Sequence, residues 1–428
     1  MTQVQLAMQL NQLIQAGPNI FLKLNPEIID FTHKVEFNLI FLAKSFELQI
    51  EIDEINYIEI LTLVKTALFE ENDLFIIGWN IKNLFTYLLA KTGSDFVITN
   101  KLLDLKLAES FIGIRERSPS TFSEVLNRLK LIFQDSSWDK FKNIYQNIYY
   151  PLMTAVIPRI EAEGVFHTEK RKILFPYYEI EGQVGGRLSC QLAYEQCFNP
   201  HSLSEEERTK LYPKANGFKF LYFDYQFHEV CVLAWLTKDE TLRDLTEEGD
   251  FYKKLYTLVT GNPCDSEVKR SFCKNYLFLP TIYGQSISTL AERAKVDISI
   301  ADKLVKRLHN LLPSTFAWLN NYELVNGVCT DYVGRKRHFV ENEEYKYRNF
   351  IIQSPGAIFT LEKLVALHKA IKDYGAIVAH IYDGFVVRCD NKQTEMTQSV
   401  CLKALESESD ILPGLKLKVN CKISNSLA

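Results

Sequence analysis

Two aspartates in this sequence lie in or directly after apolar runs that predict β-strands. Asp224 ends the run at 218–224. Asp383 lies inside the run at 376–388, in a Tyr-Asp-Gly sequence typical of a hairpin tip. Carboxylates on adjacent strands can hold two hard divalent cations, usually Mg²⁺. Two such ions activate an attacking oxygen and stabilise a leaving oxygen in phosphoryl transfer. From spacing alone, an aspartate at a turn or strand end without a catalytic role is the commoner explanation.

A second group of residues could bind phosphates. Arg270 and Lys274 are four residues apart in a segment with a helical pattern, so they share one face of that helix. Two cations on one face suit a triphosphate, whose oxygens accept charge-assisted hydrogen bonds. Phe278 follows at the same spacing and is expected on the same face. The alternative is a solvated basic face beside a buried aromatic residue.

Five short segments together, in their order, resemble family A DNA polymerases, the bacterial polymerase I-like group. The segment FDYQFHEVCVLAW resembles motif A of that family, and RSFCK with the later Phe and Tyr-Gly resembles motif B, the fingers helix. IYDG resembles motif C, GRLS resembles the segment before motif A, and GRKR resembles the segment after motif B. In chain order they occupy residues 186–189, 223–235, 270–284, 334–337 and 381–384. The resemblance covers about residues 140–428.

The resemblance implies a template-directed DNA polymerase that adds dNTPs to a primer 3′ end by two-metal phosphoryl transfer. Asp224 and Asp383 would bind two Mg²⁺ ions, with Mn²⁺ as a substitute, and the backbone carbonyl of Tyr225 would be a further ligand. Lys274 would also protonate the pyrophosphate that leaves. The implied catalytic residues are Asp224, Asp383 and Lys274.

The same resemblance assigns residues to the nucleotide and to primer-template DNA. Glu229 would be a steric gate against a ribose 2′-hydroxyl, its alternative being an exposed helix glutamate. Tyr252 stands where the family usually has a phosphate-binding His, and Gln353 where an amide meets the template or minor groove. The implied nucleotide-binding residues are Arg270, Lys274, Phe278, Tyr283, Glu229, Tyr252 and Tyr225. The implied DNA-binding residues are Arg187, Gly284, Arg335, Arg337 and Gln353.

The polymerase motifs depart from the family in two places. Motif C has Gly384 where a Glu is usual and Tyr382 where a His is usual, which predicts weakened rather than abolished activity. Motif B has one residue more than the family, since Lys274 and Tyr283 are nine positions apart instead of eight. It also contains Pro280, which removes a backbone donor. We therefore expect the fingers helix to bend or bulge before Tyr283.

Two further departures concern whole parts of the chain. Only 21 residues separate Val165 from Arg187, too few for the helical hairpin of a thumb, which predicts low processivity unless a clamp partner replaces it. The first 150 residues alternate strand-like and helical runs, and 77–82 with 103–105 resemble segments of a 3′–5′ exonuclease. They contain no Asp-x-Glu triplet, and Asn83 stands near the expected metal-binding position. We predict no proofreading; the alternative is an unrelated α/β scaffold.

The expected fold class is α+β, a right-hand polymerase palm with an antiparallel sheet, helical fingers and a reduced thumb. An α/β RNase H-like domain of the exonuclease type would precede it, and the whole would be a compact, phage-like form. The predicted domains are the degenerate exonuclease-like domain at 1–140, a connecting helix and vestigial thumb at 141–186, the palm at 187–235 and 330–428, and the fingers at 236–329.

Composition excludes some classes and leaves others open. The 428 residues are 47% hydrophobic and 24% charged, which is typical of a globular protein and excludes dominant disorder. The net charge of −4 neither predicts nor forbids nucleic-acid binding. No apolar run predicts a membrane span or a secretory signal, and the nine scattered cysteines indicate reduced thiols.

These features favour a cytoplasmic enzyme, associated with the nucleoid of a bacterium or a phage-infected host, with an organelle left open. Two alternatives to a DNA polymerase stay in view. One is a non-catalytic DNA-binding or assembly subunit of a replication complex on a polymerase scaffold. The other is related chemistry, either template-independent terminal transfer or RNA synthesis, although Glu229 argues against ribonucleotides.

Overall fold

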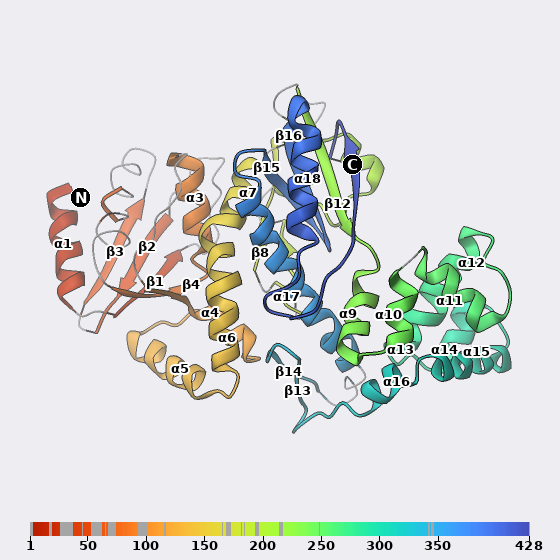
Figure 1. The fold of residues 1–428 in the computed structure, drawn as a ribbon. Coiled ribbons are helices and arrows are strands. Elements are labelled where there is room, and N and C mark those ends of the chain that lie inside the picture. The colour runs from red at the N-terminus through yellow and green to blue at the C-terminus, as the bar shows by residue number, and fades with distance from the viewer. Residues whose placement is uncertain are drawn as a thin grey trace. The chain divides into compact units, whose positions relative to one another are not determined.

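The computed structural model describes most of the chain, and the structural statements below apply to these residues. They are 3–16, 19–25, 37–44, 46–52, 62–64, 66, 74–92, 101–114, 117–164, 166–167, 173–180, 182–183, 185–192, 197–213, 217–247, 249–340, 343 and 346–427. The chain has a mixed α+β fold (Figure 1). It separates into two compact units: unit 1 is Met1–Asp224, Thr360–Leu405 and Asn420–Ala428, and unit 2 is Tyr225–Phe359 and Glu406–Val419.

The N-terminal part of unit 1 contains a five-stranded mixed sheet in the order β3-β2-β1-β4-β5. β1, β4 and β5 run parallel, whereas β2 is antiparallel to both β1 and β3. Residues of β3 alternate between exposed and buried, as expected of a strand with one face on the core. Strand and helix alternate here as the sequence predicts. The elements are α1 (Gln3–Gln15), β1 (Asn19–Asn25), β2 (Phe37–Leu42), β3 (Glu47–Ile52), β4 (Phe75–Trp79), α3 (Lys82–Thr92), β5 (Lys101–Asp104), α4 (Leu105–Phe111) and α5 (Phe122–Gln134).

A long helical run follows, in which π-turns interrupt the α-helix. Its parts are α6 (Trp138–Ile144), η2 (Tyr145–Tyr149), η3 (Leu152–Val156) and α7 (Ile157–Glu163). Gly164 ends the run, and its N–H donates to the carbonyl of Ile160 at 2.8 Å. The described residues between Gly164 and Leu192 form short strands and no helix. The absence of a helix from those described positions is consistent with the predicted reduced thumb, which stays a prediction.

The two predicted strands that carry the aspartates pair within unit 1. A four-stranded sheet has the order β15-β16-β12-β17, and β16 is antiparallel to both β12 and β15. The sequence predicts this antiparallel arrangement and the hairpin between β15 and β16. The strands are β12 (Phe218–Tyr225), β15 (Ala376–Ile381), β16 (Gly384–Asp390) and β17 (Val419–Ser424).

Shorter elements complete unit 1. Two small sheets have the orders β10-β7-β6-β11 and β8-β9. Their strands are β6 (Phe166–His167), β7 (Ile173–Pro176), β8 (Tyr178–Glu179), β9 (Ser189–Cys190), β10 (Cys197–Phe198) and β11 (Tyr212–Pro213). The remaining helices are α8 (Glu205–Thr209), η6 (Asn391–Gln393) and α18 (Thr394–Leu405).

Unit 2 is mainly helical, as predicted for residues 236–329. Asp and Ser side chains cap several of its helices, so helix starts follow local sequence. Its core is formed by apolar faces of these helices. The elements are α9 (His228–Thr237), α10 (Glu240–Glu247), α11 (Phe251–Thr260), α12 (Glu267–Phe272), η4 (Cys273–Phe278), α13 (Leu279–Ile282), α14 (Ile287–Ala294), α15 (Ile298–Leu311), α16 (Pro313–Asn320), β13 (Val328–Thr330) and β14 (Lys336–His338).

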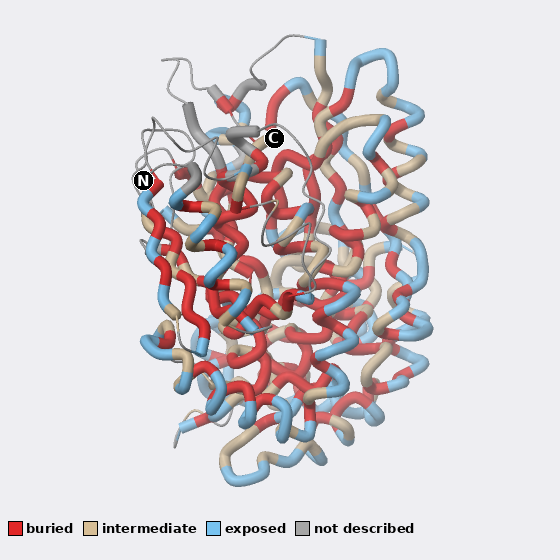
Figure 2. Tube along the Cα trace, turned by 90° about the vertical axis from the view of Figure 1, so that its left-hand side faces the viewer, coloured by how far each residue is buried: buried red, intermediate tan, exposed pale blue. Residues whose placement is uncertain are grey.

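Helix α17 (Tyr347–Ala370) continues through the boundary between the units. Within the described part of the chain, it alone is long and apolar enough to cross a membrane, but 83% of its apolar window is buried in the protein. That burial is expected of a core helix. Figure 2 shows the buried residues, in red, along the strands and inner helix faces.

Candidate functional site

The hairpin of β15 and β16 brings the two predicted aspartates to one end of the sheet in unit 1. Asp224 on β12 lies directly opposite Gly384 on β16, in register. Gly384 is the residue after Asp383, so the two aspartates come from neighbouring strand ends. The turn between the strands is tight, with Tyr382 in the left-handed region at φ 55°. Asp224 is exposed and Asp383 is partly exposed.

Arg187 contacts one of these carboxylates. Its guanidinium lies 3.3 Å from an Oδ1 of Asp383, and both side chains are about four-fifths covered, with exposures of 19% and 23%. Arg187 follows a tight turn. In that turn Gly186 has φ 79° and donates its N–H to the carbonyl of Gln183. The structure thus brings together Arg187 and Asp383, which the sequence assigned separately to DNA and to metal.

The glycine in motif C has a steric explanation. A Cβ atom at Gly384 would lie 2.8 Å from the carbonyl oxygen of Phe223 and 2.9 Å from the hydroxyl of Tyr222. The first atom belongs to the backbone and cannot move cheaply. Burial, followed by the charge of Asp224, raises the pKa of Tyr222 to about 12, so its hydroxyl stays protonated. Any side chain at position 384 would therefore require this end of the sheet to shift.

The donor set suits a hard divalent cation. Asp224 and Asp383 offer carboxylate oxygens at a solvent-accessible strand end, and such oxygens are the ligands that Mg²⁺ prefers. Among the described residues, no group of three or more His, Cys, Asp or Glu side chains has the arrangement of a metal site. A cation at the two aspartates would therefore take its remaining ligands from backbone, water or substrate.

A cluster of cations lies in unit 2 around the ring of Tyr252. Arg270 on α12 lies 5.5 Å from the ring centroid of Tyr252, and Lys274 on η4 lies 5.7 Å from it. Both distances are within the range of cation–π attraction. Tyr252 is only 5% exposed, and its ring packs against those of Phe251 and Phe278. The structure thus gathers three of the predicted nucleotide-binding residues.

Asp250 belongs to this cluster, and sequence reasoning missed it. One of its oxygens accepts from Nε of Arg270 at 2.6 Å, and the other caps α11 by accepting from the N–H of Lys253 at 3.0 Å. Arg270 also pairs with Glu267 at 3.0 Å. An Asp two residues before Tyr252 is a visible helix-cap signal in the sequence. The ion pair between Asp250 and Arg270 joins residues that are 20 positions apart in the sequence, so no local pattern predicts it.

Glu229 and Gln353 meet although they are 124 residues apart in the sequence. The amide of Gln353 donates to a carboxylate oxygen of Glu229 at 2.8 Å. Glu229 lies near enough to Tyr252 for its charge, after burial, to help raise the pKa of that phenol. One linked group within unit 2, which we call the cation cluster, is therefore formed by six residues: Glu229, Gln353, Asp250, Tyr252, Arg270 and Lys274.

The predicted bulge is confirmed in the segment that resembles motif B. The six residues of η4 form a π-helix directly before α13, which begins at Leu279 with Pro280 in its first turn. A π-turn absorbs an extra residue, and Pro is tolerated where a helix begins. Lys274 and Phe278 both lie in this π-turn, so the four-residue spacing of an α-helix, which predicted them on one face, does not apply between them. Phe278 is 1% exposed and packs against the ring of Tyr252, and its predicted contact with a sugar stays a prediction.

Arg335 also differs from expectation. It is 1% exposed, its Nε donates to the hydroxyl of Ser354 at 2.9 Å, and its N–H donates to Asp331 at 2.8 Å. Burial raises the pKa of Asp331 to about 6, although the charge of Arg335 opposes that change. This burial disagrees with a DNA contact for Arg335, and a role in packing replaces that prediction.

Of the remaining residues in unit 2 that the sequence predicts to bind nucleotide, DNA or metal, all except Tyr225 lie on or near the surface of that unit. Gly284 is exposed, with φ 79° directly after α13, and Tyr283 precedes it. Arg337 on β14 is partly exposed and stacks on Phe339 at 4.5 Å. Tyr225 is 4% exposed, and its ring packs against Phe359, so only its backbone is in question as a metal ligand.

The segments that resemble an exonuclease serve the packing of unit 1. Asp104 is 2% exposed and caps α4, and it also accepts from the N–H of Ile81 at 3.0 Å. Burial raises the pKa of its carboxyl. Asn83 is 2% exposed and accepts from the hydroxyl of Tyr177. Among the described residues here, the carboxylate that could bind a metal is thus already engaged as a cap.

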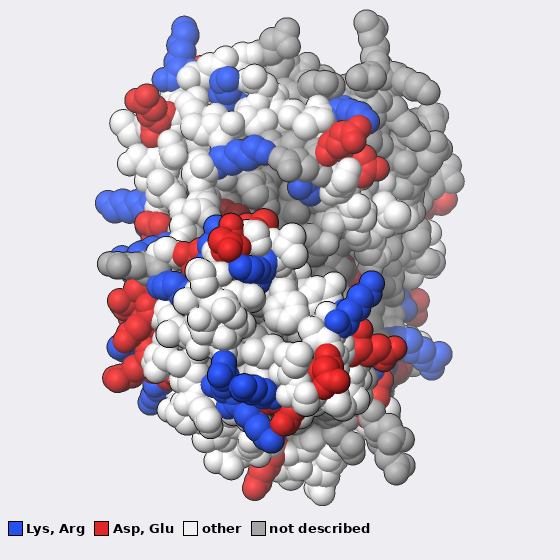
Figure 3. Space-filling view, turned by 90° about the vertical axis from the view of Figure 1, so that its right-hand side faces the viewer, with Lys and Arg blue, Asp and Glu red and all other residues white. Residues whose placement is uncertain are grey.

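Charge on the surface follows the neutral balance of the sequence. Figure 3 shows basic and acidic side chains interspersed over one face, with no extended patch of either sign among its described residues. On this face, therefore, the described residues form no broad basic surface of the kind typical of nucleic-acid binding.

Comparison with known proteins gives a consistent family. A family model described as DNA polymerase family A matches residues 99–428. The thermostable DNA polymerase I of Thermus filiformis is 23% identical over 308 residues, which are 68% of this chain and 35% of that protein. DNA polymerase theta of Caenorhabditis elegans is 25% identical over 220 residues, 48% of this chain and 13% of that protein. The chain thus spans about a third or less of the length of these curated relatives.

A solved structure shares the fold. The POL domain of Pol1 from M. smegmatis, in complex with DNA primer-template and dNTP, matches with a TM-score of 0.71 at 13% identity. The match covers 100% of this chain and 98% of that chain.

Proposed function

Because the chain belongs to DNA polymerase family A, we propose that it is a template-directed DNA polymerase that adds dNTPs to the 3′ end of a primer. The observation that carries the proposal is the register of Asp224 opposite Gly384, which sets two carboxylates at neighbouring strand ends. The activity of the relatives named DNA polymerase and the DNA-bound state of the structural match support it.

Asp224, Asp383 and the carbonyl of Tyr225 are the proposed ligands of two Mg²⁺ ions. Bound there, the ions would lower the pKa of the primer hydroxyl and neutralise the triphosphate. Arg187 balances the charge of Asp383 at 3.3 Å and is the proposed contact to the primer end. Residues 187–235 and 330–428 are the proposed palm that holds these groups, and residues 236–329 are the proposed fingers.

The cation cluster is the proposed binding site of the triphosphate. Arg270 and Lys274 supply positive charge at the Tyr252 ring, and Lys274 is the proposed proton donor to pyrophosphate. Glu229, held by Gln353 at 2.8 Å, is the proposed gate against a 2′-hydroxyl. A hydrogen-bonded carboxylate is a firmer steric barrier than a mobile one, because its rotamer is fixed.

The enzyme is also proposed to lack proofreading and to have low intrinsic processivity. The first proposal is supported by the engagement of Asp104 and Asn83 in packing, and the second by the short strands at described positions between Gly164 and Leu192. A compact, phage-like polymerase with a reduced thumb would require a partner that clamps the duplex.

Primer extension with two variants tests this proposal. We expect the wild-type protein to extend a primed DNA template in Mg²⁺ or Mn²⁺, and Asp224→Ala and Asp383→Ala to lose at least about a hundredfold in rate. Asp373→Ala is the matched control, since Asp373 is an exposed aspartate in the turn before β15. If neither metal supports extension while DNA binding is intact, the result favours the second candidate, a non-catalytic subunit, or an enzyme that needs its clamp partner. The lack of a carboxylate at Gly384 favours the non-catalytic subunit.

A further inference from the structure

A buried glutamate in unit 1 joins the N-terminal domain to the rest of that unit. Glu161 on α7 is fully buried, and its carboxylate accepts from Nζ of Lys82 at 2.7 Å and from the hydroxyl of Thr86 at 2.6 Å. Both partners lie on α3. The same carboxylate accepts from the N–H of Tyr178 at 2.7 Å. A buried charge requires such partners, so these three contacts fix where α3, α7 and β8 sit.

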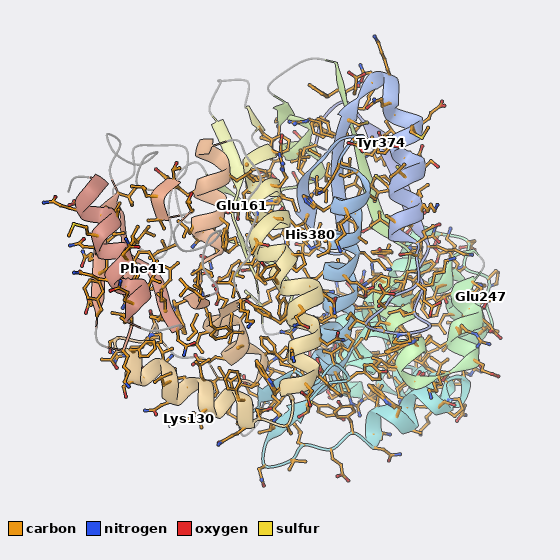
Figure 4. All side chains as sticks on the ribbon, turned by 60° about the vertical axis from the view of Figure 1, so that its left-hand side comes forward. Phe41, Lys130, Glu161, Glu247, Tyr374 and His380 are labelled. Carbon is orange, nitrogen blue, oxygen red and sulfur yellow. The ribbon has the colours of Figure 1, made fainter. Side chains whose placement is uncertain are left out.

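Tyr178 carries the connection to the strand that precedes Asp383. Its ring is fully buried, and its hydroxyl donates to the carbonyl of His380 at 2.8 Å and accepts from the N–H of His380 at 2.8 Å. β15 is the edge strand of its sheet, so its outward backbone groups have no neighbouring strand to bond. One phenol satisfies both groups of His380 at that edge. Figure 4 shows Glu161 on α7 and His380 on β15 in the same region of unit 1.

The packing of α7 on β15 is close for a second reason. A Cβ atom at Gly164 would lie 2.4 Å from the carbonyl oxygen of Val378, so only glycine allows this approach. Glu163, next to it, pairs with Arg388 on β16 at 2.9 Å. Both strands of the hairpin are therefore held by the end of α7, and the Asp383 turn lies three residues beyond His380.

We propose that Glu161 and Tyr178 are positioning residues for Asp383, and that the N-terminal domain supports the metal site through this network. The inference rests on the proposed function, because it assigns Asp383 a catalytic metal. The exonuclease-like domain then has a supporting role, since Lys82 and Thr86 on its helix α3 anchor the network by hydrogen bonds to Glu161.

Tyr178→Phe is the direct test, because it removes one hydroxyl and takes from the N–H of His380 its hydrogen-bond partner. The carbonyl of His380 keeps only its contact with Nε2 of His201 at 3.1 Å. We expect Mn²⁺ binding, followed by electron paramagnetic resonance, to weaken by about tenfold. This is the low end of the loss caused by removing a direct partner of a metal ligand, because Tyr178 acts on Asp383 through the backbone of His380. The Mg²⁺ concentration for half-maximal extension should rise in parallel, while KM for dNTP stays within about twofold, since the cation cluster is untouched. Hydrogen exchange of the His380 amide should become faster.

Tyr374→Phe is the matched control, the same change in the turn before β15, and it should bind Mn²⁺ like the wild type. If Tyr178→Phe does not fold, Glu161→Gln carries the test, with the same weakening expected. Wild-type Mn²⁺ affinity in the folded Tyr178→Phe protein, or in Glu161→Gln where that protein fails to fold, would overturn the inference. If the wild-type protein extends no primer, the proposed function fails, and Mn²⁺ affinity still reports on positioning.

Discussion

Asp250 illustrates how much of the cation cluster depends on one side chain. It caps the helix that carries Tyr252 and holds Arg270 through Nε, so it fixes both relative to each other. The pKa of Asp250 is lowered overall. Partial burial favours the protonated acid, but the hydrogen bonds from Arg270 and from the N–H of Lys253 stabilise the carboxylate by more. The carboxylate is therefore charged at neutral pH, and it orients the guanidinium rather than merely lying beside it.

We predict that Asp250→Asn raises KM for dNTP about tenfold, since a hydrogen bond to a charged group contributes about 1.5 kcal/mol. The amide oxygen keeps the cap of α11, so the fold and kcat should change little. Steady-state single-nucleotide incorporation measures both constants. Asp265→Asn is the control, because Asp265 pairs with Lys269 at 2.9 Å on the exposed surface. An unchanged KM in Asp250→Asn would contradict the orienting role.

At the residue scale, local spacing predicted neighbours well and distant partners poorly. The prediction that Arg270 and Lys274 lie near each other needs only the four-residue spacing of a helix. The bond from Gln353 to Glu229 and the ion pair from Arg270 to Asp250 join distant segments, so no periodicity announces them. Arg335 was assigned to DNA because the GRKR segment resembles a family segment, and no local pattern shows that Asp331 and Ser354 bond it inside the protein.

At the element scale, the π-helix η4 explains how the segment that resembles motif B accommodates the one extra residue predicted from the sequence. The turn widens to hold six residues between α12 and α13, so the flanking helices keep their own α-helical register. Deleting a residue from the wide turn should therefore convert it to α-helix, while Arg270 and Tyr283 stay near their places.

We predict that deletion of Asn275, an exposed residue of η4, leaves the melting temperature within a few degrees and activity within about tenfold. Deletion of Lys306, an exposed residue in the regular helix α15, should instead rotate all later residues by about 100° and unfold unit 2. Circular dichroism melts and primer extension on both proteins check this. Equal damage from the two deletions would show that η4 does not absorb the extra residue.

The hairpin of β15 and β16 contains a second test, because His380 is buried at its edge. Burial, helped by the charge of His201, lowers the pKa of His380 to about 3. Between this pKa and an ordinary value near 6.5, the unfolded chain binds a proton that the folded chain does not. Stability from this group is full above about pH 6.5 and is lost as the pH falls.

At pH 5 this loss amounts to about 2 kcal/mol. We predict that His380→Gln shows a correspondingly smaller fall in unfolding free energy between pH 7.5 and 5.0. Urea denaturation of both proteins at the two pH values measures it, and the carboxylates titrate in both proteins and cancel. Parallel losses in the two proteins would show that His380 does not titrate in the unfolding step.

The helices and strands that the sequence predicted are those whose pattern lies within one short segment. The Tyr-Asp-Gly tip and its apolar flanks predicted the hairpin, and Gly164 predicted the end of the long helical run. The pairing of β17 with β12 joins residues about 200 apart, and strands of two to four residues such as β8 are too short for any periodicity. Yet β8 carries Tyr178, on which the edge of the sheet depends.

At the scale of the whole molecule, the proposed lack of proofreading concerns the N-terminal part of unit 1. We predict no shortening of a mismatched, end-labelled primer in Mg²⁺ or Mn²⁺ without dNTPs, and none from Asn83→Asp. Position 83 is 2% exposed and engaged by Tyr177, so a carboxylate there would be buried away from solvent. Gel analysis over hours suffices, and exonucleolytic ladders from the wild type would show that the domain still cleaves DNA.

Templated DNA synthesis is the activity on which the other proposals depend, and single-nucleotide incorporation measures it. Four primed templates that differ only in the next template base would each be offered every dNTP and every rNTP, in Mg²⁺ and in Mn²⁺. We expect that only the complementary dNTP is added, with at least about tenfold preference over its ribonucleotide because of Glu229. Addition of the same nucleotide on every template, or no addition in either metal, would contradict a templated polymerase.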